Sequence, residues 1–207
     1  MLHCLKTTAR TTVRTLAFAA LVAVPALSTG PAPAASGSAS WYADRDASRL
    51  AFVYERGGEA AEGSFSRFTA RGAFDPERPR EARLELRIRT ESIDLGSRVE
   101  SAFATSVEWF DSKAHPVAVY RLETLEPLGG DLYRAFGTLT IKGRERALVT
   151  DIALAMEETP EGRRARASGR LEIDRRPFGL GVGPMAAFVT LGDTVEVAFD
   201  ISAFPEP

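Results

Sequence analysis

The stretch that decides the fold is Glu81–Arg89, with the sequence EARLELRIR. Every even-numbered position in it is apolar and every odd-numbered position is charged. Because successive side chains of a strand point to opposite faces, the apolar set shares one face. This set is Ala82, Leu84, Leu86 and Ile88. A strand with one wet and one buried face predicts an antiparallel sheet.

The chain beyond this strand predicts a short helical insertion. Ser97–Ser106 is a plausible helical run between two loops, and it leads to the aromatic pair Trp109 and Phe110. An aromatic pair placed after a strand and a short helix can plug the end of a rolled-up sheet. The stretch therefore predicts a closed β structure with a covered mouth.

The same two-residue alternation recurs through the rest of the chain, separated by turn-length loops. The clearest further runs are Ser48–Glu55, Val117–Leu125, Leu132–Lys142, Leu148–Met156, Ala165–Ile173 and Asp193–Ala203. No long amphipathic helices alternate with them, which argues against a parallel α/β sheet. We predict an all-β fold, an eight-stranded antiparallel β-barrel, with a β-sandwich as the alternative.

One segment departs from this alternation. Phe65 and Phe68 cannot share a face in a regular strand, although the run from Phe68 to Phe74 alternates normally. A β-bulge near Ser66 would restore the phase and bend the strand, as closure of a barrel requires.

The N-terminus has the pattern of an export signal. A basic region containing Lys6, Arg10 and Arg14 precedes the apolar run Leu16–Leu27, which is short for a membrane span. We predict a signal peptide over residues 1–34, a flexible leader over 35–40 and a single domain over 41–204. The expected location is periplasmic or secreted, and we do not expect an integral membrane protein after cleavage.

Composition excludes several classes of function. The one cysteine, Cys4, lies in the predicted signal, so we expect no disulfide and no thiolate metal site in the mature chain. Removal of the three basic residues of the signal would change the formal net charge from −2 to −5. An acidic chain of this kind argues against a nucleic-acid partner.

Several short motifs, taken in order, resemble the YceI family of exported, lipocalin-like barrels associated with polyisoprenoid lipids. The motifs are Gly63–Phe68, Ser92–Gly96, Glu108–Asp111 with His115-Pro116, Gly137–Gly143, Ile173–Gly179 and Gly192–Val195. The resemblance covers Trp41 to Ala203. Ala47 and Pro177 depart from the family pattern, which often has His and an acidic residue there, so the identity of the ligand is left open. The resemblance implies a lipocalin-like barrel whose partner is an isoprenoid lipid or quinone.

We predict that apolar side chains facing inward form the wall of a ligand site, although the same residues could fill a packed core. The inward set is Phe52, Tyr54, Leu86, Ile88, Tyr120, Leu139, Val197 and Phe199. We add the plug residues Trp109 and Phe110 and, where the family motif lies, Arg175 and Phe178. Arg175 could meet a lipid phosphate or carboxylate, or it could be ion-paired at the surface. A homodimer is possible.

The sequence offers little for catalysis. His115 is the only histidine of the predicted mature chain, and no cysteine accompanies it. The run Gly179–Gly183 resembles a phosphate loop but lies between strands and before Pro184, so it indicates tight turns at a barrel rim. We therefore predict a non-enzymatic protein without cofactor or metal that sequesters or carries an apolar lipid. The alternative is a stress-protective or structural interaction module with a packed core.

Overall fold

The computed structural model describes residues 39–160 and 162–206. The signal peptide predicted over 1–34 lies outside these residues, as does the predicted leader up to residue 38. Ala39 and Ser40, the end of that leader, instead pair with Phe74 and Ala73 in the first strand. The first strand therefore begins well before the predicted run Ser48–Glu55 and includes the last two residues of the predicted leader, because backbone pairing does not depend on the small side chains that suggested a leader.

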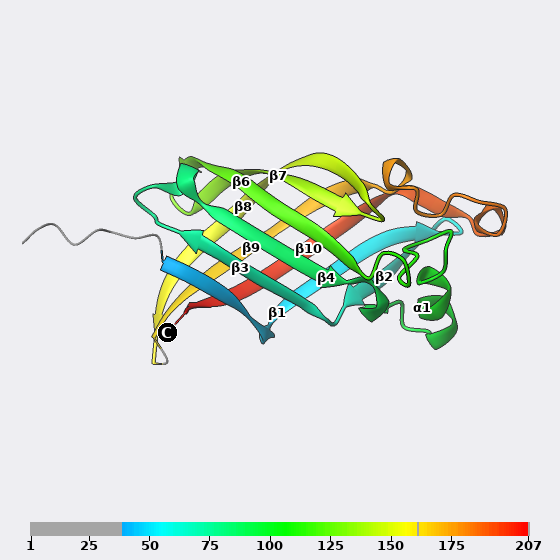
Figure 1. The fold of residues 1–207 in the computed structure, drawn as a ribbon, viewed down its shortest axis with the longest axis horizontal. Helices are drawn as coiled ribbons and strands as arrows, with labels where there is room; N and C mark the ends of the chain where they lie inside the picture. Colours follow the sequence, from blue (N-terminus) through cyan, green and yellow to red (C-terminus); the bar gives the residue numbers. More distant parts are fainter. Residues whose placement is uncertain (1–38, 161, 207) are drawn as a thin grey trace, which may run out of the picture. The chain divides into compact units, whose positions relative to one another are not determined.

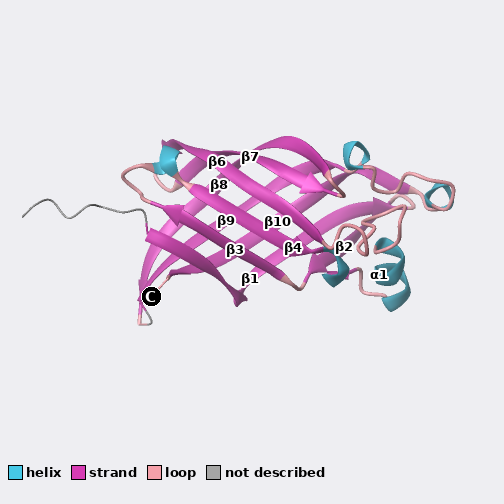
Figure 2. Ribbon diagram, viewed as in Figure 1, coloured by secondary structure: helices cyan, strands magenta, loops and turns pink. Residues whose placement is uncertain are grey.

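The described residues form one antiparallel sheet with short helices at its loops (Figures 1 and 2). The strands are β1 (Ala39–Arg56), β2 (Glu59–Phe65), β3 (Phe68–Phe74), β4 (Arg83–Arg89), β5 (Ile93–Asp94), β6 (Val117–Gly129), β7 (Leu132–Ile141), β8 (Arg144–Thr159), β9 (Gly162–Asp174) and β10 (Leu191–Pro205). The helix α1 spans Arg98–Ala104, and single 3₁₀ turns are η1 (Pro79–Glu81), η2 (Thr90–Ser92), η3 (Arg176–Phe178) and η4 (Ala186–Phe188).

The sheet closes on itself, which confirms the predicted barrel and excludes an open sandwich. β10 pairs with β1 from Trp41↔Pro205 to Arg56↔Leu191. β2 and β3 pair with different parts of β1, so together they fill one strand position of the barrel. β5 pairs with β2 and β4 pairs with β3, so β5 and β4 together fill the next position. Counted by position, the barrel has eight antiparallel strands, and the predicted helical insertion is present as α1.

The alternation in Glu81–Arg89 has the predicted consequence. Leu84, Leu86 and Ile88 of β4 face the barrel interior. The charged residues of the strand lie outside, where Glu85 accepts hydrogen bonds from Arg87 and from Arg121 of β6. The outer face is thus covered by cross-strand ion pairs and the inner face by aliphatic side chains.

The irregularity predicted near Ser66 is present as a break between β2 and β3. The Ser66 and Arg67 amides leave the strand ladder and donate to the carbonyl and the hydroxyl oxygen of Ser92. This two-residue interruption lets both Phe65 and Phe68 face inward, where Phe65 lines the interior and Phe68 is buried.

Candidate ligand-binding cavity

The barrel contains a cavity of about 230 Å³, and its lining residues are apolar except for Tyr120, Thr150 and Arg175. A cavity of roughly 150 Å³ suffices to bind benzene in an apolar protein interior. The barrel interior therefore has room for one prenyl unit and part of a second. The packed-core alternative required a filled interior, and the structure does not show one.

Nine of the twelve predicted site residues line this cavity. They are Phe52, Leu86, Ile88, Phe110, Tyr120, Leu139, Arg175, Val197 and Phe199. They come from β1, β4, β6, β7 and β10 and from the loops at one end, so the wall is assembled from segments distant in the sequence. Contact of these residues with a ligand stays a prediction.

The other three predicted site residues lie outside the cavity wall. Tyr54 is half-buried one step along β1, with its ring centroid 5.9 Å from that of Phe52. Trp109 and Phe178 are buried above the cavity rather than in its wall. The alternation of β1 correctly placed Tyr54 on the same face of the strand as Phe52, but it could not predict how far along the strand the cavity extends.

Three aromatic rings narrow the cavity near α1. The Phe65 centroid lies 5.5 Å from that of Phe52 and 5.7 Å from that of Phe110, the latter pair edge to face. A Cβ atom at Gly63 would overlap the ring of Phe52, so a glycine is needed where this ring crosses β2. Phe65 was missed as a site residue because the phase change at Ser66 concealed its inward direction.

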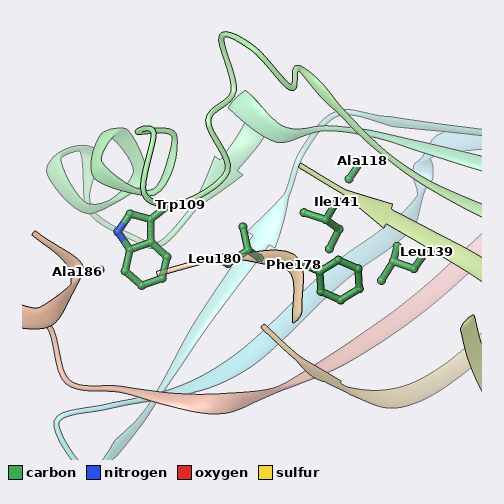
Figure 3. Close-up of a cluster of buried hydrophobic side chains, with 7 residues drawn as sticks. All are labelled: Trp109, Ala118, Leu139, Ile141, Phe178, Leu180 and Ala186. Atoms are coloured by element: carbon green, nitrogen blue, oxygen red, sulfur yellow. The ribbon is translucent and has the colours of Figure 1, made fainter. Parts of the chain in front are cut away.

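The predicted plug is present at the same end. One buried apolar cluster joins the loops of this end to the start of β6 and the end of β7. It contains Trp109, Phe178, Leu180 and Ala186 from the loops and Ala118, Leu139 and Ile141 from the strands. Figure 3 shows Leu180 between Trp109 and Phe178, with the strand residues Ile141 and Leu139 on the side away from Trp109. The β9–β10 loop and the segment after α1 therefore close this end of the barrel together.

Arg175 fastens the loop to the barrel. Its Nε donates to the Gly192 carbonyl at 2.9 Å, Nη1 donates to the carbonyls of Leu180 and Gly181, and Nη2 donates to the Leu191 carbonyl and to Asp193 Oδ1. These contacts use all five guanidinium N–H groups. The guanidinium carbon also lies 5.8 Å from the centroid of the Trp109 ring. The network gives Arg175 a structural role, and its predicted contact with a ligand head group stays a prediction.

Glu108 holds the outer part of the same loop. Its backbone carbonyl accepts from the Gly181 amide at 2.8 Å, and its carboxylate accepts from the amides of Met185 and Ala186. Gly181 and Gly183 have φ of 67° and 149°, and a Cβ at either would collide with Trp109 or Glu108. The glycine-rich run is thus a tight rim loop, as its surroundings in the sequence indicated, and not a phosphate loop.

The cavity wall contains little chemistry. Tyr120 and Thr150 supply hydroxyl groups, and burial raises the pKa of Tyr120 to about 12. The Tyr120 hydroxyl is buried and has no hydrogen-bond partner among the described residues. His115 packs over Gly143, with Cε1 3.4 Å from where a Cβ of that glycine would lie. Over residues 39–160 and 162–206, no three His, Cys, Asp or Glu side chains gather as a metal site.

Small residues in the wall are the main feature that sequence reasoning missed. Ala70, Ala118, Ala135 and Ala167 line the cavity from four different strands. An inward alanine in one strand is unremarkable by itself, and only the closed sheet shows that the four face a common space. No signal in a single strand could have revealed this.

A closed antiparallel barrel with an apolar interior and a loop-covered end defines the lipocalin-like class of fold. Within that class, residues 41–203 match the family model described as the YceI-like domain. The match spans most of the chain, and the chain therefore belongs to the YceI family.

Relatives and solved structures agree with this assignment. A UPF0312 protein of Shewanella baltica is 25% identical over 174 residues, covering 80% of this chain and 90% of the relative. A UPF0312 protein of Azotobacter vinelandii is 24% identical over 138 residues, covering 65% and 72%. The crystal structure of Burkholderia cenocepacia BcnA superposes with a TM-score of 0.72 at 28% identity, covering 78% of this chain and 99% of BcnA.

A second solved structure shares the fold. A domain of Saccharophagus degradans described as a polyisoprenoid binding domain superposes with a TM-score of 0.64 at 18% identity, covering 81% and 99% of the two chains. At this identity the likeness shows the fold alone. Separately, no helix within the described part of the chain is long and apolar enough to cross a membrane.

Proposed function

We propose that this protein binds an isoprenoid-type lipid, a quinone or polyprenyl chain, in the barrel and shields it from water. The observation that carries the proposal is the cavity inside the barrel, whose lining residues are almost all apolar. Such a lining offers little to a polar ligand and removes hydrocarbon from water. The name of the Saccharophagus degradans domain, which refers to polyisoprenoid binding, supports the same class of ligand.

The energetics favour an apolar chain. A ligand that loses about 300 Å² of apolar surface to the cavity gains roughly 7 kcal/mol, from which the costs of ordering are subtracted. The present volume accepts only the end of a long polyprenyl chain. A longer segment would have to displace the rings of Phe52, Phe65 and Phe110, which pack tilted or edge to face rather than in a rigid stack.

We propose sequestration or carriage, without a chemical step. The wall hydroxyls of Tyr120 and Thr150 have no neighbouring general base among the cavity-lining residues. Export to the periplasm or the medium, proposed from the N-terminal sequence, fits such a role because quinones and polyprenyl lipids need a protein carrier wherever they leave a membrane.

The test is binding of quinones with increasing numbers of prenyl units, measured by quenching of tryptophan fluorescence. Ala167→Phe places a ring in the cavity, whereas Ala147→Phe places the same ring on the exposed outer face of β8. We expect the first variant to weaken binding at least about tenfold, since a ring removes much of the available space, and the second to leave it unchanged. Equal binding by both variants would contradict the proposed site.

A further inference from the structure

We infer that the loop-covered end of the barrel docks on a lipid bilayer that contains anionic lipid. The contact surface is the rim patch, defined as Val99, Val107, Val182, Met185 and Phe188. The inference deepens the proposed function and rests on it for its purpose, since a bilayer is where an isoprenoid ligand is found.

The rim patch stands out by exposure. Among the described residues, its five members are the most exposed of all large apolar side chains, from 57% for Val182 to 85% for Phe188. The next in rank, Val149, lies on the outer face of β8. Clustering of the most exposed apolar side chains on one part of a monomer marks an interaction site, whereas single ones elsewhere do not.

The patch belongs to one connected surface. Val99 is in α1 and Val107 follows it, while the other three lie in the β9–β10 loop. The Glu108 carboxylate joins the two segments through the amides of Met185 and Ala186. The turn after β1 adds a second link, because Arg56 pairs with Glu100 of α1 and the Gly57 amide donates to the Thr190 carbonyl.

The patch is also continuous with the cavity. Leu180 lines the cavity and is 7% exposed, and Val182, two residues further along the same loop, belongs to the patch. A single layer of polypeptide thus separates the ligand site from the outer surface. In Figure 1 the segment that carries η4 projects beyond the ends of the strands, on the same side as α1. Apolar side chains on such a projecting loop can insert into a bilayer while the strands stay outside it.

Local charge complements anionic lipid. The β7–β8 turn carries Lys142, and β8 begins with Arg144 and Arg146, with Glu145 between them. None of the three basic residues forms an ion pair within the described residues. Lys142 Nζ donates to the Val107 carbonyl at 2.6 Å and to the Gly179 carbonyl at 3.3 Å, which places this turn against both segments of the patch. Apolar tips beside basic side chains are the pattern of interfacial membrane binding.

The size of the patch favours a bilayer over a protein partner. A stable protein interface uses roughly 20–30 residues on each side, far more than the five apolar side chains gathered here. A bilayer needs no complementary shape and accepts a few loop tips. Self-association of two copies through the patch is the competing outcome of the test.

The test is co-sedimentation with vesicles of equimolar phosphatidylcholine and phosphatidylglycerol. We expect the wild type to bind, and the double variant Met185→Ser with Phe188→Ser to bind at least about tenfold more weakly, because two exposed apolar side chains are lost. The matched control is Leu128→Ser with Leu132→Ser, which removes two exposed leucines at the opposite end of the barrel. We expect the control to bind as the wild type does.

Three outcomes would overturn the inference: no vesicle binding by the wild type, equal binding by the two double variants, or loss of a dimer in sedimentation velocity when the patch is changed. Quinone binding is measured on the same proteins by fluorescence in the absence of vesicles. A wild type that binds quinone but not vesicles contradicts docking alone, and one that binds vesicles but not quinone supports docking and contradicts the proposed function.

Discussion

The two ends of the barrel are closed by different means. At the end opposite α1, closure is made by apolar side chains of the strands themselves and by Ala82 beside η1. Leu125 and Ala135 of this layer are each 2% exposed. At the α1 end, closure is made by loops, and buried apolar side chains there depend on the polar contacts of Arg175 and Glu108.

The difference indicates which end admits a ligand. Side chains that project from hydrogen-bonded strands cannot leave the interior unless the sheet itself opens, so the packed end is fixed for as long as the protein is folded. The loop end can open by exchanging a few hydrogen bonds for water while every strand stays paired. We therefore expect changes at the packed end to alter global stability and changes at the loop end to alter local opening and ligand exchange.

The largest effect is expected for Leu125→Ala at the packed end. Loss of a fully buried leucine should lower the free energy of unfolding by about 3 kcal/mol, measured by urea denaturation. Leu128→Ala on the same strand, where the leucine is exposed, should change it by less than about 0.5 kcal/mol. Equal effects of the two variants would mean that this end is not packed as described.

A smaller global effect and a larger local one are expected for Arg175→Gln. The change removes most of the hydrogen bonds to the loop carbonyls. We expect the free energy of unfolding to fall by about 2 kcal/mol and amide exchange at Leu180 and Gly181 to become faster. The control is Arg176→Gln, an exposed arginine that pairs with the same Asp193. Unchanged exchange in the Arg175 variant would contradict the view that this residue fastens the loop.

Tyr120 packs against the buried clusters of both ends of the barrel. We expect Tyr120→Phe to leave the free energy of unfolding unchanged or to raise it by up to about 1 kcal/mol. Its hydroxyl is buried without a partner, and burial raises its pKa to about 12. Because the phenol titrates later in the folded than in the unfolded chain, stability should fall as pH rises from 10 toward 12. Between pH 10 and 12, the free energy of unfolding of Tyr120→Phe, measured with urea, should therefore fall less than that of the wild type. Destabilisation of 1 kcal/mol or more would show that the hydroxyl has a partner.

The smallest effect is expected in acid at the loop end. The hydrogen bond from Arg176, with added attraction to Arg176 and Arg175, holds the pKa of Asp193 below its usual value of 3.8. Its stabilisation is therefore complete above that value and is lost as pH falls through the lowered pKa. In a Trp41→Phe background, the fluorescence of Trp109 should change as Asp193 is protonated, and this acid transition should be absent from Asp193→Asn. An acid transition of the same size in the Asn variant would exclude Asp193 as its source.

Much of the fold was predictable because strand alternation is a local property. Leu84, Leu86 and Ile88 face inward, as their spacing required, and the phase conflict between Phe65 and Phe68 marked the place where the strand breaks. The start of β1 before Ser48 was not predicted, since the pairing of Ser40 with Ala73 depends on a strand that lies elsewhere in the sequence.

The site was less predictable, because a cavity is a property of the assembled barrel. Alternation gave the direction of Tyr54 but not its distance from the cavity. Ala118 and Ala167 create space only in combination with what faces them. The five-donor network of Arg175 could not be anticipated either. Four of its five acceptors are backbone carbonyls, and two of these, Leu180 and Gly181, lie in a loop whose path the sequence left open.

Native mass spectrometry of protein purified without detergent, from cells that make quinones and polyprenyl lipids, would show directly whether the barrel interior holds an apolar chain. We expect one bound isoprenoid lipid per barrel, retained by the Ala147→Phe variant and absent from the Ala167→Phe variant. Ligand-free wild-type protein from several hosts, together with no uptake of added quinone, would contradict this expectation.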